Sequence, residues 1–116
     1  MGRIIHVELT AAGLDGAAEF YAKAFGWQVT PSPFADGYLV AETGAGDGID
    51  GAIMKREYQQ QPTIVWIQVD DLEATRVAVV AAGGAADQEP QEIPGVGRVA
   101  YVRDPDGVVL GLRQPV

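Results

Sequence analysis

A pattern of strand, turn and helix occurs twice in this chain, and the two copies lie half a chain length apart. Residues 4–27 alternate apolar and polar side chains and then change to helical spacing, and residues 63–84 do the same. Val7 matches Val65 at an offset of 58 (65 − 7), which is half of the 116 residues. The repeat therefore predicts one small module used twice.

The first copy continues into three more short segments with strand character. Alternation predicts a strand over 3–10, and helical spacing predicts a helix that begins at Leu14 and ends at Gly26. The order of elements in this module, about residues 1–57, is then βαβββ. Its last three strands are expected at 27–30, 38–42 and 49–55.

The second copy repeats this order after a polar linker at about 57–62. A strand over 63–69 leads into a helix that ends at Gly83, and Asp70 followed by Glu73 resembles a capping box at its start. This module covers about 63–116. Its last three strands are expected at 86–93, 98–103 and 108–113, with Asp104-Pro105-Asp106-Gly107 as a type I turn between the last two.

The composition excludes several classes of function. The formal net charge of −8 disfavours binding to the phosphate backbones of nucleic acids and to anionic lipid, and the eight Lys and Arg residues are scattered along the chain. No apolar run approaches the roughly 20 residues that span a bilayer, and no signal-peptide pattern follows Met1. With zero cysteines, the chain has no disulfide, thiol nucleophile or thiolate metal site. We expect a cytoplasmic protein that binds neither nucleic acid nor membrane.

Three sequence runs stand out beside a histidine on the first strand, His6: F-Y-x-x-x-F-G at 20–26, V-D-D-L-E-A-T at 69–75 and D-P-D-G at 104–107. Together they resemble the vicinal oxygen chelate superfamily, the group of glyoxalase I, extradiol dioxygenases and bleomycin-resistance proteins. The resemblance covers the whole chain. It implies a single α+β domain over 1–116, in which two βαβββ modules form a curved, mostly antiparallel sheet of eight strands with two helices on its convex side.

In metal-dependent members of that superfamily, each module supplies one metal ligand from its first strand and one from its last. Carried over to this sequence, the four positions are His6, Ala52, Ile64 and Gly111. Only His6 has a donor side chain, whereas a catalytic site normally needs about three protein ligands. We therefore expect no metal and no other cofactor, and we expect neither glyoxalase I nor extradiol dioxygenase activity.

Strand alternation, combined with an open concave face, predicts which side chains would contact a ligand in a cleft of the sheet. His6 and Glu8 are the candidate catalytic pair, a base oriented by a carboxylate. Tyr38 is a further possibility on its strand. The candidate ligand-binding residues are Trp66, Gln68, Asp50, Met54, Tyr101 and Arg113.

Each candidate has a structural alternative. His6 can be a histidine hydrogen-bonded within the fold, Trp66 a core aromatic, and Arg113 the partner of Glu8 or Asp50 in a salt bridge. Two functions remain open from the sequence. One is metal-independent binding of a small organic molecule, as in ligand carriers or drug-sequestering proteins. The other is a metal-free isomerase, epimerase or lyase that transfers protons through His6 and Glu8. In both cases we expect a homodimer, because each half exposes strand edges and apolar surface.

Overall fold

The computed structural model describes residues 2–116, so Met1, the first residue of the predicted domain, lies outside the described part. The chain divides into two compact units, whose bounds differ from those of the two predicted modules, because residues 2–5 group with the second half and Thr63 and Ile64 with the first. From here on, module one is His6–Ile64, and module two is Val65–Val116 together with residues 2–5.

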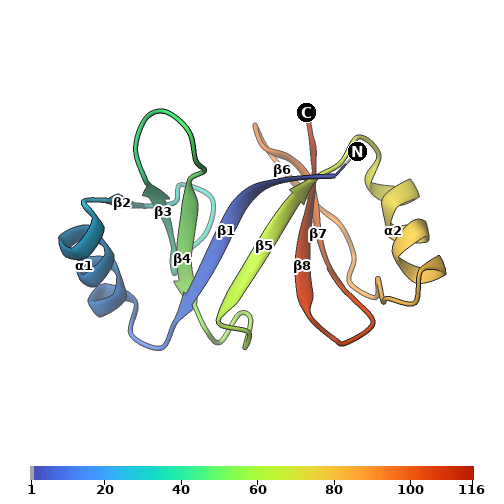
Figure 1. Cartoon of the computed structure of the whole chain (residues 1–116), viewed down its shortest axis with the longest axis horizontal. Coiled ribbons are helices and arrows are strands. Elements are labelled where there is room, and N and C mark those ends of the chain that lie inside the picture. Colours follow the sequence, from blue (N-terminus) through green and yellow to red (C-terminus); the bar gives the residue numbers. More distant parts are fainter. Residues whose placement is uncertain (1) are drawn as a thin grey trace. The chain divides into compact units, whose positions relative to one another are not determined.

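Module one has the predicted order βαβββ (Figure 1). Its strands follow the spatial order β2-β3-β4-β1, with β1 and β4 parallel and the other two pairs antiparallel. The helix α1 packs against β4 and β2. The elements are β1 (Arg3–Ala11), α1 (Leu14–Phe25), β2 (Gln28–Pro31), β3 (Tyr38–Glu42) and β4 (Gly51–Lys55).

Module two repeats this arrangement. Its strands follow the order β5-β8-β7-β6, again with one parallel pair, β5 with β8. The prediction of two βαβββ modules with eight strands and two helices is confirmed within residues 2–116, and the pairing is mixed rather than purely antiparallel. The elements are β5 (Thr63–Gln68), α2 (Leu72–Ala81), β6 (Gln91–Ile93), β7 (Gly97–Arg103) and β8 (Val109–Pro115).

The core of module two lies between α2 and one face of its strands. Leu72 is fully buried at the start of α2, and it packs with Ala100 and Val102 of β7 and with Leu112 of β8. Burying a leucine side chain stabilises a fold by about 1.5–3 kcal/mol. Because side chains alternate along a strand, the neighbours Tyr101 and Gly111 belong to the opposite face, away from α2.

The predicted end of α1 agrees with the structure, and the predicted start of α2 does not. Gly26 ends α1 in the left-handed conformation, with φ of 72°, and its N–H donates to Ala22 O at 2.9 Å. The predicted start of α2 is wrong by one residue. The N-cap is Asp71, whose carboxylate accepts from Ala74 N at 3.0 Å, and not Asp70.

The predicted strand 86–93 is shorter in the structure, because β6 covers only Gln91–Ile93. The reason is Arg76 on α2. Its Nη2 donates to the carbonyl oxygens of Ala86, at 3.0 Å, and of Gln88, at 2.9 Å. Carbonyl groups that accept from a helix side chain in this way stay outside the strand ladder, and Pro90 supplies no N–H to it.

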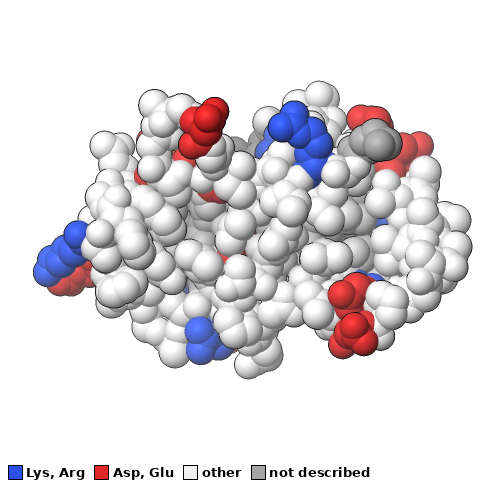
Figure 2. Space-filling view, viewed as in Figure 1, with Lys and Arg blue, Asp and Glu red and all other residues white. Residues whose placement is uncertain are grey.

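The turn predicted at 104–107 is confirmed. Gly107 N donates to Asp104 O at 3.0 Å, and the Asp104 carboxylate accepts from Asp106 N and Val108 N at 2.9 Å each. Among residues 2–116, no helix is long and apolar enough to cross a bilayer. The Lys and Arg side chains on the face shown in Figure 2 do not gather into one patch.

Candidate functional site

One face of the module-one strands carries His6 and Glu8, as alternation predicts. In the register of the strands, Glu8 is the partner of Ala52 on β4, and Ala52 is the partner of Val40 on β3. Tyr38 lies two residues before Val40 on β3, so it belongs to the same face. The strands therefore bring a histidine, a carboxylate and a tyrosine to one side of this module.

Tyr38 connects the two candidate catalytic residues. Its hydroxyl donates to Glu8 Oε2 at 2.7 Å, and its oxygen lies 3.1 Å from His6 Nε2. Glu8 is 2% exposed, so this contact is made in a part of the fold with little water. Because the single hydroxyl hydrogen of Tyr38 goes to Glu8, its oxygen is left to accept, and the arrangement favours the His6 tautomer with hydrogen on Nε2.

Two further predicted ligand-binding residues of module one, Met54 and Asp50, make contacts that support the fold. Met54 is 2% exposed and lies between Thr10 and Tyr38 as the strand partner of both. Asp50 is exposed and precedes β4. The Asp50 carboxylate accepts from Thr43 N at 2.9 Å, so it fastens the loop between β3 and β4.

A polar group that the sequence analysis did not identify lies further along β1. Thr10 is 7% exposed, and its hydroxyl donates to the Gln61 carbonyl at 2.9 Å. Arg56 donates from Nε to Thr10 Oγ1 at 3.1 Å and from Nη2 to Thr10 O at 3.0 Å. This network connects the predicted linker to β1. Among the described residues, the Arg56 guanidinium forms no ion pair with a carboxylate.

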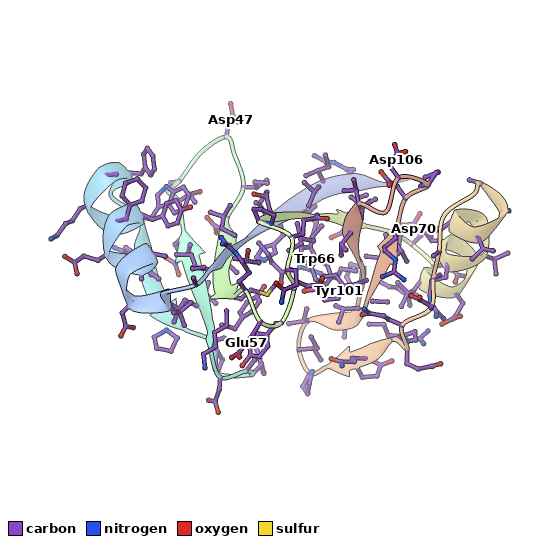
Figure 3. The ribbon with its side chains drawn as sticks, turned by 90° about the horizontal axis from the view of Figure 1, so that it is seen from below. Asp47, Glu57, Trp66, Asp70, Tyr101 and Asp106 are labelled. Carbon is purple, nitrogen blue, oxygen red and sulfur yellow. The ribbon has the colours of Figure 1, made fainter. Side chains whose placement is uncertain are left out.

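Module two carries an aromatic pair on the face that α2 does not cover. Trp66 of β5 and Tyr101 of β7 are both strand partners of Gly111 on β8, and their ring centroids are 5.2 Å apart (Figure 3). A Cβ atom at Gly111 would lie 2.2 Å from Trp66 Cδ2. The indole therefore occupies the space that any side chain at position 111 would need.

Gln68 and Arg113 lie next to this pair on the same face, as strand partners on β5 and β8. The Nε atom of Arg113 is buried and has no hydrogen-bond partner among residues 2–116. Within module two, Arg113 also has no carboxylate within salt-bridge distance.

The residues at the four metal-ligand positions do not fit a metal. Ala52 and Ile64 are buried apolar residues, with 1% and 0% exposure, and Gly111 has no room for a donor side chain. The described residues contain no group of three or more His, Asp or Glu side chains that would hold a metal ion. A single imidazole does not hold a divalent ion against water. We derive no chemistry through a metal.

Curated proteins similar to this chain carry glyoxalase-type names. A "Probable lactoylglutathione lyase" of Vibrio parahaemolyticus is 34% identical over 97% of this chain and 91% of its own length. A "Putative glyoxylase CFP32" of Mycobacterium bovis is 34% identical over 98% of this chain, which spans only 44% of that protein.

Solved structures show the same fold at low identity. Methylmalonyl-CoA epimerase from Mycobacterium tuberculosis superposes with a TM-score of 0.71 at 20% identity, covering 97% of this chain and 87% of the epimerase. A superfamily member from Vibrio splendidus has a TM-score of 0.70 at 17% identity, with full coverage of both chains. Residues 3–112 match the family described as "Glyoxalase/Bleomycin resistance protein/Dioxygenase superfamily", and the chain belongs to this superfamily.

Proposed function

We propose that this protein binds a small organic molecule without a catalytic metal, and that His6 is one of the groups that contact the ligand. The observation that supports this most is the set of residues at the positions for metal ligands. Ala52 and Ile64 have no donor atoms, and the Trp66 ring fills the space at Gly111. Module one offers a hydrogen-bonded polar chain, and module two offers an aromatic pair. Groups of both kinds are usual in small-molecule sites.

The polar chain of module one is buried at Glu8 and only partly buried at His6. Its members are linked to one another through hydrogen bonds of 2.7 and 3.1 Å, while the neighbouring β4 residue Ile53 is fully buried on the opposite face. An imidazole that is only partly buried remains able to exchange hydrogen bonds with a ligand. His6 is accordingly expected to matter more to binding than to folding.

The test compares wild type with His6→Ala. A panel of small organic compounds is screened by thermal shift in the presence of a chelator. We expect His6→Ala to change the free energy of unfolding by less than about 1 kcal/mol. We also expect it to abolish the ligand-induced stabilisation, which reaches about 2.7 kcal/mol at a ligand concentration of about 100 Kd. An unfolded variant, or ligand shifts that survive the substitution, would show that His6 is structural.

A second candidate function is supported by the contact between Tyr38 and Glu8. A buried carboxylate linked to an imidazole through one hydroxyl is an arrangement suited to general acid–base catalysis. A curated relative carries the name of a lyase, which supports keeping an isomerase, epimerase or lyase as the second candidate. That such an enzyme would work without a metal is part of this proposal. Nitrogen NMR of the His6 ring tests the arrangement: we expect hydrogen on Nε2 in wild type and a loss of that preference in Tyr38→Phe, but not in Tyr21→Phe.

We further propose that the chain forms a homodimer. The helix α1 has no buried residue, and it exposes Phe20 and Phe25, at 58% and 61%, beside Tyr21 and Trp27. An aromatic surface of this kind is unusual on a monomer. Light scattering at micromolar concentration should give twice the mass of the chain, and a single-chain mass would remove the proposal.

A further inference from the structure

The cations of this chain have partners or face solvent, with one exception. Five of the eight Lys and Arg residues form ion pairs with carboxylates among the described residues, and Arg56 is held by Thr10. Arg3 is exposed to solvent. The ion-paired residues are Lys23, Lys55, Arg76, Arg98 and Arg103.

Arg113 is the exception. It is partly buried, and its Nε atom is buried without an acceptor, as is the Nε atom of Arg76. Unlike the guanidinium of Arg76, which pairs with Glu73, that of Arg113 has neither a hydrogen bond nor an ion pair within module two. This is unexpected in a chain that has 16 Asp and Glu residues for 8 Lys and Arg residues. A buried donor without an acceptor costs about 1–3 kcal/mol, and more when the group is charged. An acidic ligand that supplies the acceptor would remove this cost.

The strand register places Arg113 beside the aromatic pair. Arg113 follows Gly111 by two residues on β8, so the two share a face of the sheet, and Gly111 is the strand partner of both Trp66 and Tyr101. Two residues along a strand correspond to about 7 Å. A planar ring near the aromatic pair and an acidic group at Arg113 are thus separated by the length of a small aromatic acid.

From these observations we infer that Arg113 binds an acidic group of the ligand, a carboxylate or a phosphate, so that the molecules this protein takes are organic anions with an apolar or aromatic part. Guanidinium matches the geometry of both anions with two parallel N–H donors. Gln68, the strand partner of Arg113, adds an amide on the same face. This inference rests on the proposed binding function and adds the chemical class of the ligand.

Benzoate and benzamide are the probes for the test, because they share a ring and differ in the charged group. Nitrogen–proton NMR of the arginine Nε–H groups is recorded while each probe is titrated into the wild-type protein. We expect the chemical shift of the Arg113 Nε–H signal to change with benzoate concentration and to reach saturation. The signal of the exposed Arg3 should change only slightly and without saturation. Benzamide should leave the Arg113 signal in place. Equal behaviour of Arg113 and Arg3 would overturn the inference.

Substitutions separate this inference from the proposed function. Arg113→Met should lower the affinity for benzoate at least tenfold and leave the response to neutral compounds unchanged. Arg103→Met is the matched control, since Arg103 lies on the adjacent strand with its Nη2 2.6 Å from Asp87, and it should bind benzoate as wild type does. Benzoate binding that survives Arg113→Met contradicts the role of Arg113. If the wild-type protein binds neither neutral compounds nor acids, the proposed function itself is contradicted.

Discussion

The strand faces of the two modules share one backbone pattern and carry different chemistry. Glu8 of module one and Trp66 of module two are equivalent, at an offset of 58 (66 − 8), and their strand partners are Ala52 and Gly111. In module one the face holds a hydrogen-bonded chain of Glu8, Tyr38 and His6. In module two it holds the aromatic pair. The two faces therefore share their strand register and differ in the side chains that they carry.

A small residue at the last-strand position is common to both halves. The side chain of Ala52 on β4 ends at Cβ, and Ala52 is the strand partner of Glu8 on β1. Tyr38 on β3, which pairs with the other edge of β4, donates to Glu8. Gly111 has no side chain at all, and the Trp66 ring lies over it. In module two the Trp66 ring thus uses the space that a ligand side chain at position 111 would need. The difference between Ala52 and Gly111 sets how much of that space is filled, and the predictions below test it.

The largest effect is expected from Trp66→Ala in module two. The indole is 7% exposed and covers Gly111, so its removal leaves a cavity beside the Tyr101 ring. The free energy of unfolding should fall by about 3–5 kcal/mol, measured by chemical denaturation. A fall of less than about 1 kcal/mol would mean that Trp66 does not support the module, and the contrast with module one would lose its basis.

Gly111→Ala should have the next largest effect. The added Cβ would lie 2.2 Å from Trp66 Cδ2, so the ring or the strand must move, at a cost of about 1–3 kcal/mol. The same substitution in a Trp66→Ala background should cost much less, because the atom that it meets is gone. Ala52→Gly, the reverse change at the equivalent position, is the control. Additive effects of Gly111→Ala and Trp66→Ala in denaturation experiments would be inconsistent with a clash.

The smallest effect is expected from Tyr38→Phe in module one. This change removes the hydroxyl that donates to the buried Glu8 carboxylate at 2.7 Å and keeps the ring. One lost hydrogen bond of this kind costs about 1–2 kcal/mol. Tyr21→Phe, on α1, serves as the control and should leave the free energy of unfolding unchanged. Equal effects of the two substitutions would show that the hydrogen bond to Glu8 contributes nothing to stability.

The sequence predicted most of the secondary structure because its repeat made each module a check on the other. The strands of module one and the helix end at Gly26 follow from alternation, helical spacing and a glycine. The errors arose where a side chain distant in sequence competes for the backbone. Arg76 takes two carbonyl groups from the predicted strand 86–93, and alternation of residues carries no information about that contact.

The candidate site was predicted less completely for a related reason. Alternation placed His6 and Glu8 on one face, but Tyr38 joins them only through the register of β3 with β4 and of β4 with β1. That register is a property of the folded sheet. The missing metal donor at Gly111 was visible in the sequence, whereas the Trp66 ring in its place was not, since ring orientation depends on packing.

The central claim is that this protein binds a small organic molecule without a metal. Of the four positions for metal-ligating residues, only His6 carries a donor side chain. Elemental analysis of protein purified without added metal tests this most directly, with His6→Ala as the matched sample. The account predicts far less than one Zn, Ni, Mn or Fe ion per chain and the same trace content in both proteins. One tightly bound ion per chain in wild type that is lost in His6→Ala would contradict it.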